Sequence, residues 1–524
     1  MGDTGAENDF VGRTAARRAG GRAARKAERL LQRAESSMAG PTRIKSPYSP
    51  LSSCEAEGVH RAALEVLEGV GMAAPTDRVL EVALAHGCWQ GDGGRLHFPP
   101  SLVEDCLSRA ANSFPVHGRD RSHDFEAGAG RVSFATGGAA VMMLDRKTRT
   151  YRPSTLADLH DLARVAEHLA NIQWFTRPVV ATDIPDMFEL DANTLFACAA
   201  GTTKHVGMSF ARGSHLARLL PALDALAGGE GAFRRRPFCT AHATTVVSPL
   251  NFAEDSLDVA CAAVEIGMPL HLQTGPQAGA TSPAALAGTL VQGCAESLAS
   301  LSIINLMSPG YPVVLGNWTF SADLRNGSFA GGGGEAALLG AASGQMSAFY
   351  GIPGGMGAGM SDSNLPDNQA GYEKALTMAV AALSGGGFVF ESAGMLASLL
   401  GCSIEAMIID DEMLSSIRRI ARGISADDLS MSVEVIKRVA TGEGHYLADR
   451  QTLQLMETEF DYPELANRTS PEEWEASGSL DIWERARIRA EEILRQDHES
   501  RIDPVVEHMI RSRYPIHLGG ADQR

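Results

Sequence analysis

The sequence lacks any long hydrophobic run. No uninterrupted apolar stretch approaches the roughly 20 residues that a membrane-spanning helix needs, and the opening residues, MGDTGAENDF, contain no apolar core of a secretory signal. These absences argue against the membrane and secreted classes. We expect a globular protein of the cytoplasm with no membrane partner.

Cysteine is scarce and scattered along the chain. The eight cysteines stand at positions 54, 88, 106, 198, 239, 261, 294 and 402, with no C-x-x-C pair and no His–Cys pairing of the kind that builds a zinc site. The expected state of these residues is a reduced, buried thiol. The sequence therefore predicts neither a disulfide framework nor a metal site.

Positive charge is also in short supply. Lys and Arg number 46 against 63 Asp and Glu, and the net charge is −17. Because neutralisation of phosphate by Lys and Arg dominates binding to nucleic acids, this balance argues against a nucleic-acid partner.

One segment departs from that average, the Arg-rich arm VGRTAARRAGGRAARKAERLLQR (11–33). It is typical of a solvated, poorly ordered tail, and the alternative is an electrostatic handle for an acidic partner protein. A transit peptide is a weaker possibility because Asp3, Glu7 and Asp9 lie close by.

What the chain has in quantity is apolar material, 44% of 524 residues, which is enough for a large core. One large domain with attachments and three average domains are both compatible with this length. The patterning predicts an arm and linker at 1–50, a helical and β-hairpin extension at 51–150, a barrel at 151–424, and a C-terminal helical extension with a tail at 425–524. Within the second part, we expect helices over 55–112 and a hairpin with strands 131–136 and 140–145.

From about residue 155 the chain repeats one unit, an apolar run followed by a longer amphipathic stretch. The predicted strands are 172–180, 204–210, 238–247, 269–274, 312–317, 351–357, 387–392 and 406–410. Strands that alternate with helices pair in parallel, because a parallel connection needs a crossover. Eight such units predict an α/β fold of the (β/α)₈ TIM-barrel type, and an open doubly wound sheet is the alternative.

The segment GMGAGMSDSNLPDNQAGYEK (355–374) follows the sixth predicted strand, where active-site loops of such barrels lie. Its glycines let the backbone approach a ligand closely, and its polar residues bring a hydroxyl, a carboxylate and an amide to the mouth. The residues concerned are Gly355, Gly357, Gly359, Ser361, Asp362 and Asn364. The alternative is that Asp362 and Asn364 only bridge turns, while Asp367 caps the next helix.

Other predicted strand ends supply further groups. Glu391 directly follows the apolar run GFVF, so we expect its carboxylate either to face the barrel mouth or to join a buried hydrogen-bond network. Gln273 lies at the end of the fourth predicted strand and Trp318 directly follows the fifth, while Asp410 is expected to cap a helix. Tyr372 either faces the substrate or packs in an apolar stripe with Leu376.

Several separated segments resemble the trimethylamine methyltransferase family, corrinoid-dependent enzymes that demethylate amines. The resemblance spans most of residues 55–500. It rests on AGMSDSNLPDNQAGYEK (358–374), ATGGAAVMMLD with RPSTLADLHDLARVAEHLANIQWF (within 135–175), AGATSPAALAGTLVQGCAESLA (278–299) and KHVGMSF (204–210). It implies a (β/α)₈ barrel that presents an N-methyl group to the Co(I) corrinoid of a separate carrier protein. This chain would then bind no cofactor tightly itself, and we also expect a homo-oligomer.

The chain departs from the archaeal trimethylamine enzymes at Met360, where motif register places their pyrrolysine. A thioether cannot form the covalent amine adduct ascribed to pyrrolysine. The resemblance therefore favours a quaternary amine such as glycine betaine, whose methyl groups are already activated by positive charge. Asp362, Glu391 and Ser361 are the expected catalytic residues, and Met360, Asn364, Tyr372, Trp318 and Gln273 the expected substrate contacts.

A quaternary cation also favours aromatic faces nearby. The candidate walls are Trp174, Trp318, Phe320, Tyr350, Tyr372 and Phe390. Two alternatives stay open: a methyltransferase for trimethylamine or another methylamine, and a binding protein that has kept the barrel without turnover. Lyase or aldolase chemistry is disfavoured because Lys204 is the only lysine at a predicted strand end.

Overall fold

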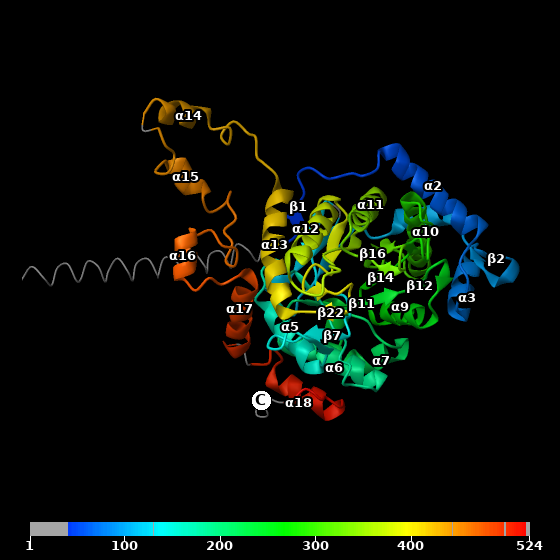
Figure 1. Cartoon of the computed structure of the whole chain (residues 1–524). Coiled ribbons are helices and arrows are strands. Elements are labelled where there is room, and N and C mark those ends of the chain that lie inside the picture. Colours follow the sequence, from blue (N-terminus) through cyan, green and yellow to red (C-terminus); the bar gives the residue numbers. More distant parts are fainter. Residues whose placement is uncertain (1–39, 129, 443, 497–498, 520–524) are drawn as a thin grey trace, which may run out of the picture. The chain divides into compact units, whose positions relative to one another are not determined.

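The computed structural model describes residues 40–519 apart from 129, 443, 497 and 498 (Figure 1). The Arg-rich arm lies outside the described residues.

Eight parallel strands form a closed ring. In order around it they are β6 (Arg131–Phe134), β9 (Trp174–Thr176), β10 (His205–Met208), β11 (Cys239–Thr244), β14 (Leu270–Thr274), β16 (Val313–Asn317), β19 (Gly354–Gly357) and β20 (Gly387–Phe390). β20 pairs in parallel with β6, and a parallel bridge between Ala135 and Trp174 joins β6 to β9. The predicted (β/α)₈ fold is confirmed.

Eight helices alternate with these strands and cover the outside of the barrel (Figure 1). They are α5 (Leu156–Glu167), α6 (Met187–Gly201), α7 (Gly213–Leu226), α9 (Glu254–Ile266), α10 (Leu286–Met307), α11 (Gly334–Tyr350), α12 (Asn368–Leu383) and α13 (Ile404–Arg422). Local chemistry sets several starts: Asp367 accepts from the Ala370 amide at the start of α12, as predicted. Among the described residues α10 alone is long and apolar enough to cross a membrane, but 83% of its apolar window is buried, as in a core helix.

The predicted eighth strand at 406–410 is wrong, because these residues lie inside α13. Their apolar run continues at helical spacing through Met407, Leu414 and Ile417, all buried, and Ser403 caps the helix start. A short apolar run does not by itself distinguish a strand from a buried helix segment. The remaining barrel strand is β6, so Asp410 is a helix-interior residue rather than a cap.

The predicted hairpin between 131–136 and 140–145 is also wrong. β6 pairs with β20 and with β1 (Thr42–Arg43), whereas β7 (Met142–Leu144) pairs with β8 (Tyr151–Pro153) and β22 (Gly401–Cys402). The intervening glycines do not form a two-residue turn. Gly137 lies against Glu391 and Gly138 against Met395, so this segment crosses the end of the barrel.

Helical extensions precede and follow the barrel along the chain. The N-terminal helices α2 (Ser53–Gly69), α3 (Asp77–Ala85) and α4 (Pro100–Arg109) pack against α10, and helices were expected over this range. The C-terminal helices are α14 (Val433–Ala440), α15 (Arg450–Leu455), α16 (Pro471–Ala476), α17 (Ile482–Gln496) and α18 (Pro504–Arg513). α17 packs on α13 and α5, and α18 on α7. The short elements are β2 (Trp89–Gln90), η1 (Asp92–Gly94), β3 (Leu96–His97), β4 (Ser113–Val116), η2 (Arg121–His123), β5 (Phe125–Gly128), α8 (Ala232–Arg235), β12 (Val246–Val247), β13 (Asn251–Phe252), β15 (Gln277–Ala278), β17 (Phe320–Asp323), β18 (Ser328–Phe329) and β21 (Met395–Leu396).

The strands separate two cores. Because successive side chains of a strand point to opposite faces, Val206 and Met208 of β10 join the large cluster between strands and helices, while His205 and Gly207 face the barrel interior. The interior is aromatic, with Trp174, Phe388 and Phe390 in one buried cluster.

Candidate active site

Glu391 has the most unusual environment of the predicted site residues. It directly follows β20 with a backbone φ of +63°, a left-handed conformation that residues other than glycine rarely adopt. Its side chain is 3% exposed, and its Oε2 atom has no hydrogen-bond partner among the described residues. Burial raises the pKa of this carboxyl to about 8. A strained, buried acid with a strongly raised pKa is typical of functional sites.

Two glycine-containing segments lie directly against Glu391. A side chain at Gly137 would meet the Glu391 Cγ at 3.4 Å, and one at Gly359 would meet the Glu391 carbonyl oxygen at 3.0 Å. Gly359 also has a φ of +91°, which favours glycine. The loops after β6 and β19 therefore cover Glu391 closely because both lack a side chain at the point of contact.

Aromatic rings lead from the barrel interior to its rim beside Glu391. Phe390 lies 5.4 Å from Trp174 and 6.2 Å from Trp318, measured between ring centroids, and Trp318 lies 6.1 Å from Phe320. Trp174 and Phe390 are buried, whereas Trp318 and Phe320 are half-buried. Four of the six predicted aromatic walls thus form one continuous set.

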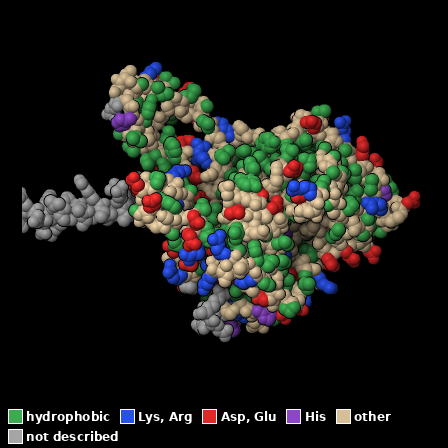
Figure 2. Space-filling model, in the orientation of Figure 1, with side chains coloured by type: hydrophobic (Ala, Val, Ile, Leu, Met, Phe, Trp, Pro, Cys, Tyr) green, Lys and Arg blue, Asp and Glu red, His purple; other side chains and the backbone are tan. Residues whose placement is uncertain are grey.

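The other two predicted walls lie elsewhere. Tyr350 ends α11 and packs edge-on against His60 of α2, on the outside of the barrel. Tyr372 is 54% exposed on α12. Figure 2 shows apolar side chains gathered over α11 and α12, where Tyr372 is exposed together with Leu338, Phe349 and Leu376. The structure therefore does not bring Tyr350 or Tyr372 to Glu391.

Asp362 bridges three loops. One of its carboxylate oxygens accepts hydrogen bonds from the Gly331 amide at 3.1 Å and the Ser398 hydroxyl at 2.8 Å, and the other accepts from the Gly332 amide at 3.2 Å. The side chain is half-buried. Every described partner of this carboxylate belongs to a loop, so Asp362 holds these loops together.

The neighbours of Asp362 are held by Glu373 of α12. The Glu373 carboxylate accepts from the Ser361 hydroxyl at 2.7 Å and from the Asp362 amide at 2.9 Å. Met360 is buried beside Gly331, and Asn364 is exposed, with its carbonyl accepting from the Tyr151 hydroxyl. Ser361 and Met360 therefore belong to the packed base of this loop, while Asn364 lies on its surface.

Another part of the rim is formed by β11, β14 and β16. Thr244 is exposed and donates to the Gln273 side-chain oxygen at 3.3 Å, and Gln273 is half-buried. Trp318 donates from its indole nitrogen to the Gly355 carbonyl at 2.8 Å. A side chain at Gly355 would crowd His271, and one at Gly357 would crowd Trp318. These two glycines therefore make room for the rings, and neither has a positive φ.

Three buried histidines inside the barrel were missed by the sequence analysis. They are His205, His242 and His271, on β10, β11 and β14. His271 and His242 contact through their Nδ1 atoms at 3.2 Å, and burial holds the pKa of both rings well below the usual value. A signal was present for two of them, because TAHAT and LHLQT alternate with period 2 and place His242 and His271 on the inward face.

A buried ion pair anchors the loop that follows Glu391. Lys374 of α12 and Asp410 of α13 lie 2.6 Å apart, both side chains are 2% exposed, and the same Asp410 oxygen accepts from the Gly394 amide at 2.8 Å. Burial raises the pKa of Asp410 despite the neighbouring lysine. The pair thus ties two helices to the chain three residues beyond Glu391.

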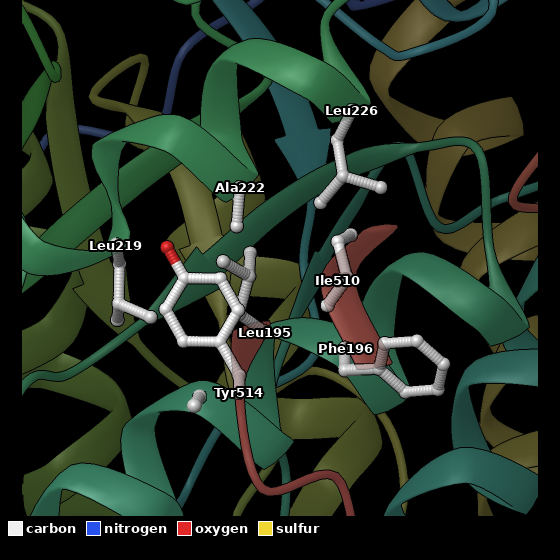
Figure 3. Close-up of a pocket in the computed structure, with 8 residues that line it drawn as sticks. Leu195, Phe196, Leu219, Ala222, Leu226, Ile510 and Tyr514 are labelled. Atoms are coloured by element: carbon white, nitrogen blue, oxygen red, sulfur yellow. The ribbon is translucent and has the colours of Figure 1, made fainter. Parts of the chain in front are cut away.

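Other parts of the chain show no comparable chemistry. In the described range no group of three or more His, Cys, Asp and Glu side chains is arranged to hold a metal ion. Figure 3 shows a small apolar cavity where α18 meets α6 and α7. Leu195, Phe196, Leu219, Ile510 and Tyr514 line it, and none of them presents a charged group. This cavity is a packing gap outside the barrel.

Comparisons with known sequences identify one family. A family model described as trimethylamine methyltransferase matches residues 18–514. A trimethylamine methyltransferase of Desulfitobacterium hafniense is 30% identical over 87% of this chain and 91% of its own length, and a glycine betaine methyltransferase of the same species is 30% identical over 89% and 96%. Among solved structures, the monomethylamine methyltransferase of Methanosarcina barkeri aligns with a TM-score of 0.42 at 13% identity, covering 88% of this chain and 97% of that chain.

Proposed function

Because the chain belongs to the trimethylamine methyltransferase family and is a methyltransferase for methylated amines, we propose that its substrate is a quaternary amine such as glycine betaine and its acceptor the Co(I) corrinoid of a carrier protein. The observation that carries this proposal is Glu391, a buried carboxylate with an unpartnered oxygen beside a set of aromatic rings. A buried charge is costly unless it is paired. A permanent cation would supply the missing partner.

The aromatic set suits such a cation for a second reason. A quaternary ammonium ion has no N–H to donate, so it is recognised by ring faces and by charge rather than by hydrogen bonds. Phe390, Trp174 and Trp318 line the barrel next to Glu391. A cation bound there would favour the ionised form of Glu391 and lower its pKa from about 8.

The acceptor would supply the nucleophile, because Co(I) in a corrinoid can take a methyl group from a cationic nitrogen while the C–N bond breaks and the tertiary amine leaves with the electron pair. The residues of this chain then have to orient and desolvate the amine. Glu391 and the rings hold the ammonium group, and the loops at Gly137 and Gly359 exclude water from Glu391. The half-buried rim at Gln273, Trp318 and Phe320 leaves one side accessible for the carrier.

Met360 supports a quaternary rather than a tertiary amine. Its thioether is buried in the loop beside Gly331 and has no nucleophilic nitrogen with which to form an adduct. A quaternary nitrogen needs no such activation because it is already fully alkylated. The glycine betaine methyltransferase among the relatives is consistent with this reading.

The test is methyl transfer from a panel of amines. Purified protein with a reduced family corrinoid carrier should convert glycine betaine, proline betaine, carnitine or choline, observed as the absorbance of the methylated corrinoid and loss of one methyl group by mass spectrometry. Trimethylamine should be inactive. Tight binding of a quaternary amine without transfer would favour the non-catalytic alternative, and absence of both would refute the proposal.

A second prediction concerns Asp362. Asp362→Asn should lower methyl transfer at least tenfold, which corresponds to about 1.4 kcal/mol, because an amide cannot accept from Gly331, Gly332 and Ser398 as the carboxylate does. Transfer rates and hydrogen exchange over 329–334 measure the effect. The control is Asp367→Asn in the same loop, where asparagine also caps a helix. Equal rates for wild type and Asp362→Asn would remove Asp362 from the site.

A further inference from the structure

A set of buried, unpartnered polar atoms lies in the barrel near Glu391. Trp174 Nε1, Thr176 Oγ1 and His242 Nε2 have no hydrogen-bond partner among the described residues, although their side chains are 0%, 7% and 5% exposed. Buried polar groups are almost always hydrogen-bonded, so each such atom requires an explanation. Trp174 and Thr176 belong to β9 and His242 to β11, the two strands on either side of β10.

The three atoms converge on one point. All lie within 2.6 Å of the position that a Cβ atom on Gly207 would occupy. Gly207 stands on β10 between β9 and β11, so the missing side chain lets the three polar groups from those strands face one spot in the barrel interior. The three polar atoms are therefore close to one another in the barrel interior.

The chemistry of the atoms defines what they accept. The Trp174 indole is only a donor, the Thr176 hydroxyl can donate, and His242 donates from Nε2 in the tautomer whose Nδ1 accepts from His271. An acceptor that cannot donate, such as a carboxylate oxygen, selects that tautomer. Three donors and no obligatory acceptor therefore match an anionic oxygen.

Positive charge is present at the same place. Arg177 directly follows Thr176, and its backbone amide donates to the Gly207 carbonyl at 3.0 Å. Its charge acts on His242. The nearby carboxylate of Asp191 is already bonded to His215 at 2.7 Å and to the Ala211 amide. Arg177 is thus a cation near His242, and its charge also acts on the Asp191 carboxylate.

We propose that Trp174, Thr176, His242 and Arg177 form a carboxylate-binding subsite, so that the substrate class is a short zwitterion that carries a carboxylate and a quaternary ammonium group. This inference rests on the proposed function for the ammonium half. The two halves of such a substrate would be close together, as a short zwitterion requires. Thr176 Cγ2 and Glu391 Cγ lie 3.7 Å and 3.4 Å from the position that a Cβ atom on Gly137 would occupy. The carboxylate points into the barrel, and the methyl groups remain at the Glu391 end.

Binding to the full-length protein tests the subsite without any methyl transfer. Calorimetry would compare three ligands, of which glycine betaine carries both groups. 3,3-Dimethylbutanoate keeps the carboxylate and the shape but lacks the charged nitrogen. Choline keeps the charged nitrogen but lacks the carboxylate. Thr176→Val should weaken the binding of glycine betaine and of 3,3-dimethylbutanoate at least tenfold. The affinity for choline should not change. Thr176→Ser should restore binding, and His242→Phe should repeat the selectivity of Thr176→Val.

The control variant is Thr245→Val, which removes a buried hydroxyl directly after β11 that bonds Ser300 of α10 and should change no affinity. Equal weakening of all three ligands by Thr176→Val would mean that the donors hold water or packing only, and would overturn the subsite. If choline binds but neither carboxylate ligand does, the subsite fails and the quaternary-amine function stands. If 3,3-dimethylbutanoate binds in a Thr176-dependent way and neither cation does, the proposed function fails and the subsite stands.

Discussion

Glu391→Gln should lower kcat/KM for a quaternary amine at least 100-fold, about 3 kcal/mol of transition-state stabilisation, while the protein stays folded. The substitution keeps the size of the side chain and removes the charge that would pair with the ammonium group. The folded state should tolerate it because Glu391 carries a pKa of about 8, so at neutral pH the carboxyl is already mostly protonated in the free protein. Steady-state transfer with the corrinoid carrier measures the effect.

The matched control for this variant is Glu405→Gln. Glu405 is also fully buried, its Oε1 atom also has no described partner, and burial also raises its pKa, but it lies in the first turn of α13 with its other oxygen bonded to Ser403. We expect unchanged transfer. If the two glutamine variants lose activity equally, a general effect of removing buried acids explains the loss and Glu391 has no special role.

Lys374→Met should destabilise the protein by about 3–5 kcal/mol, because it leaves Asp410 buried without its cation. Transfer should fall as well, since Asp410 holds the Gly394 amide and thereby the chain that follows Glu391. Chemical denaturation gives the free energy of unfolding, and residual transfer is measured under folded conditions. This effect on stability is the largest that we expect from a single substitution near the site.

The double variant Lys374→Met with Asp410→Asn separates charge from position. It removes both charges and keeps an oxygen that can accept from Gly394, so most of the lost stability and transfer should return. A double variant no more stable than Lys374→Met alone would show that the pair contributes packing rather than charge compensation.

Most of the barrel could be predicted from the sequence because parallel strands covered on both faces are continuous apolar runs. The prediction placed seven of the eight strands. It failed at AMIID (406–410), where a buried helix start has the same composition, and it assigned RVSF to a hairpin because two glycines follow it. The glycine-rich β19 could be predicted from its place in the repeat but not from strand propensity, because glycine disfavours strands. Its glycines are present because they make room for His271 and Trp318.

The site was harder to predict than the fold. Glu391 was visible because a carboxylate after GFVF contradicts the apolar run, whereas the partners of Asp362 lie at 331–332 and 398 and cannot be read from local sequence. The period-2 pattern places His242 and His271 on the inward face, but local sequence does not show which polar groups lie next to them or next to Thr176. Their meaning depends on which strands are neighbours, and only the register of β9, β10 and β11 brings them together at Gly207.

The most direct test of the account is the affinity for glycine betaine measured by calorimetry between pH 6 and 9. Only ionised Glu391 pairs with the ammonium group, and its pKa in the free protein is about 8. The dissociation constant should therefore fall about tenfold for each pH unit up to 8 and then level off, with a proton released on binding. Glu391→Gln should bind weakly at every pH. An affinity for wild type that does not change with pH, or that Glu391→Gln reproduces, would contradict the central claim that this carboxylate binds the cation.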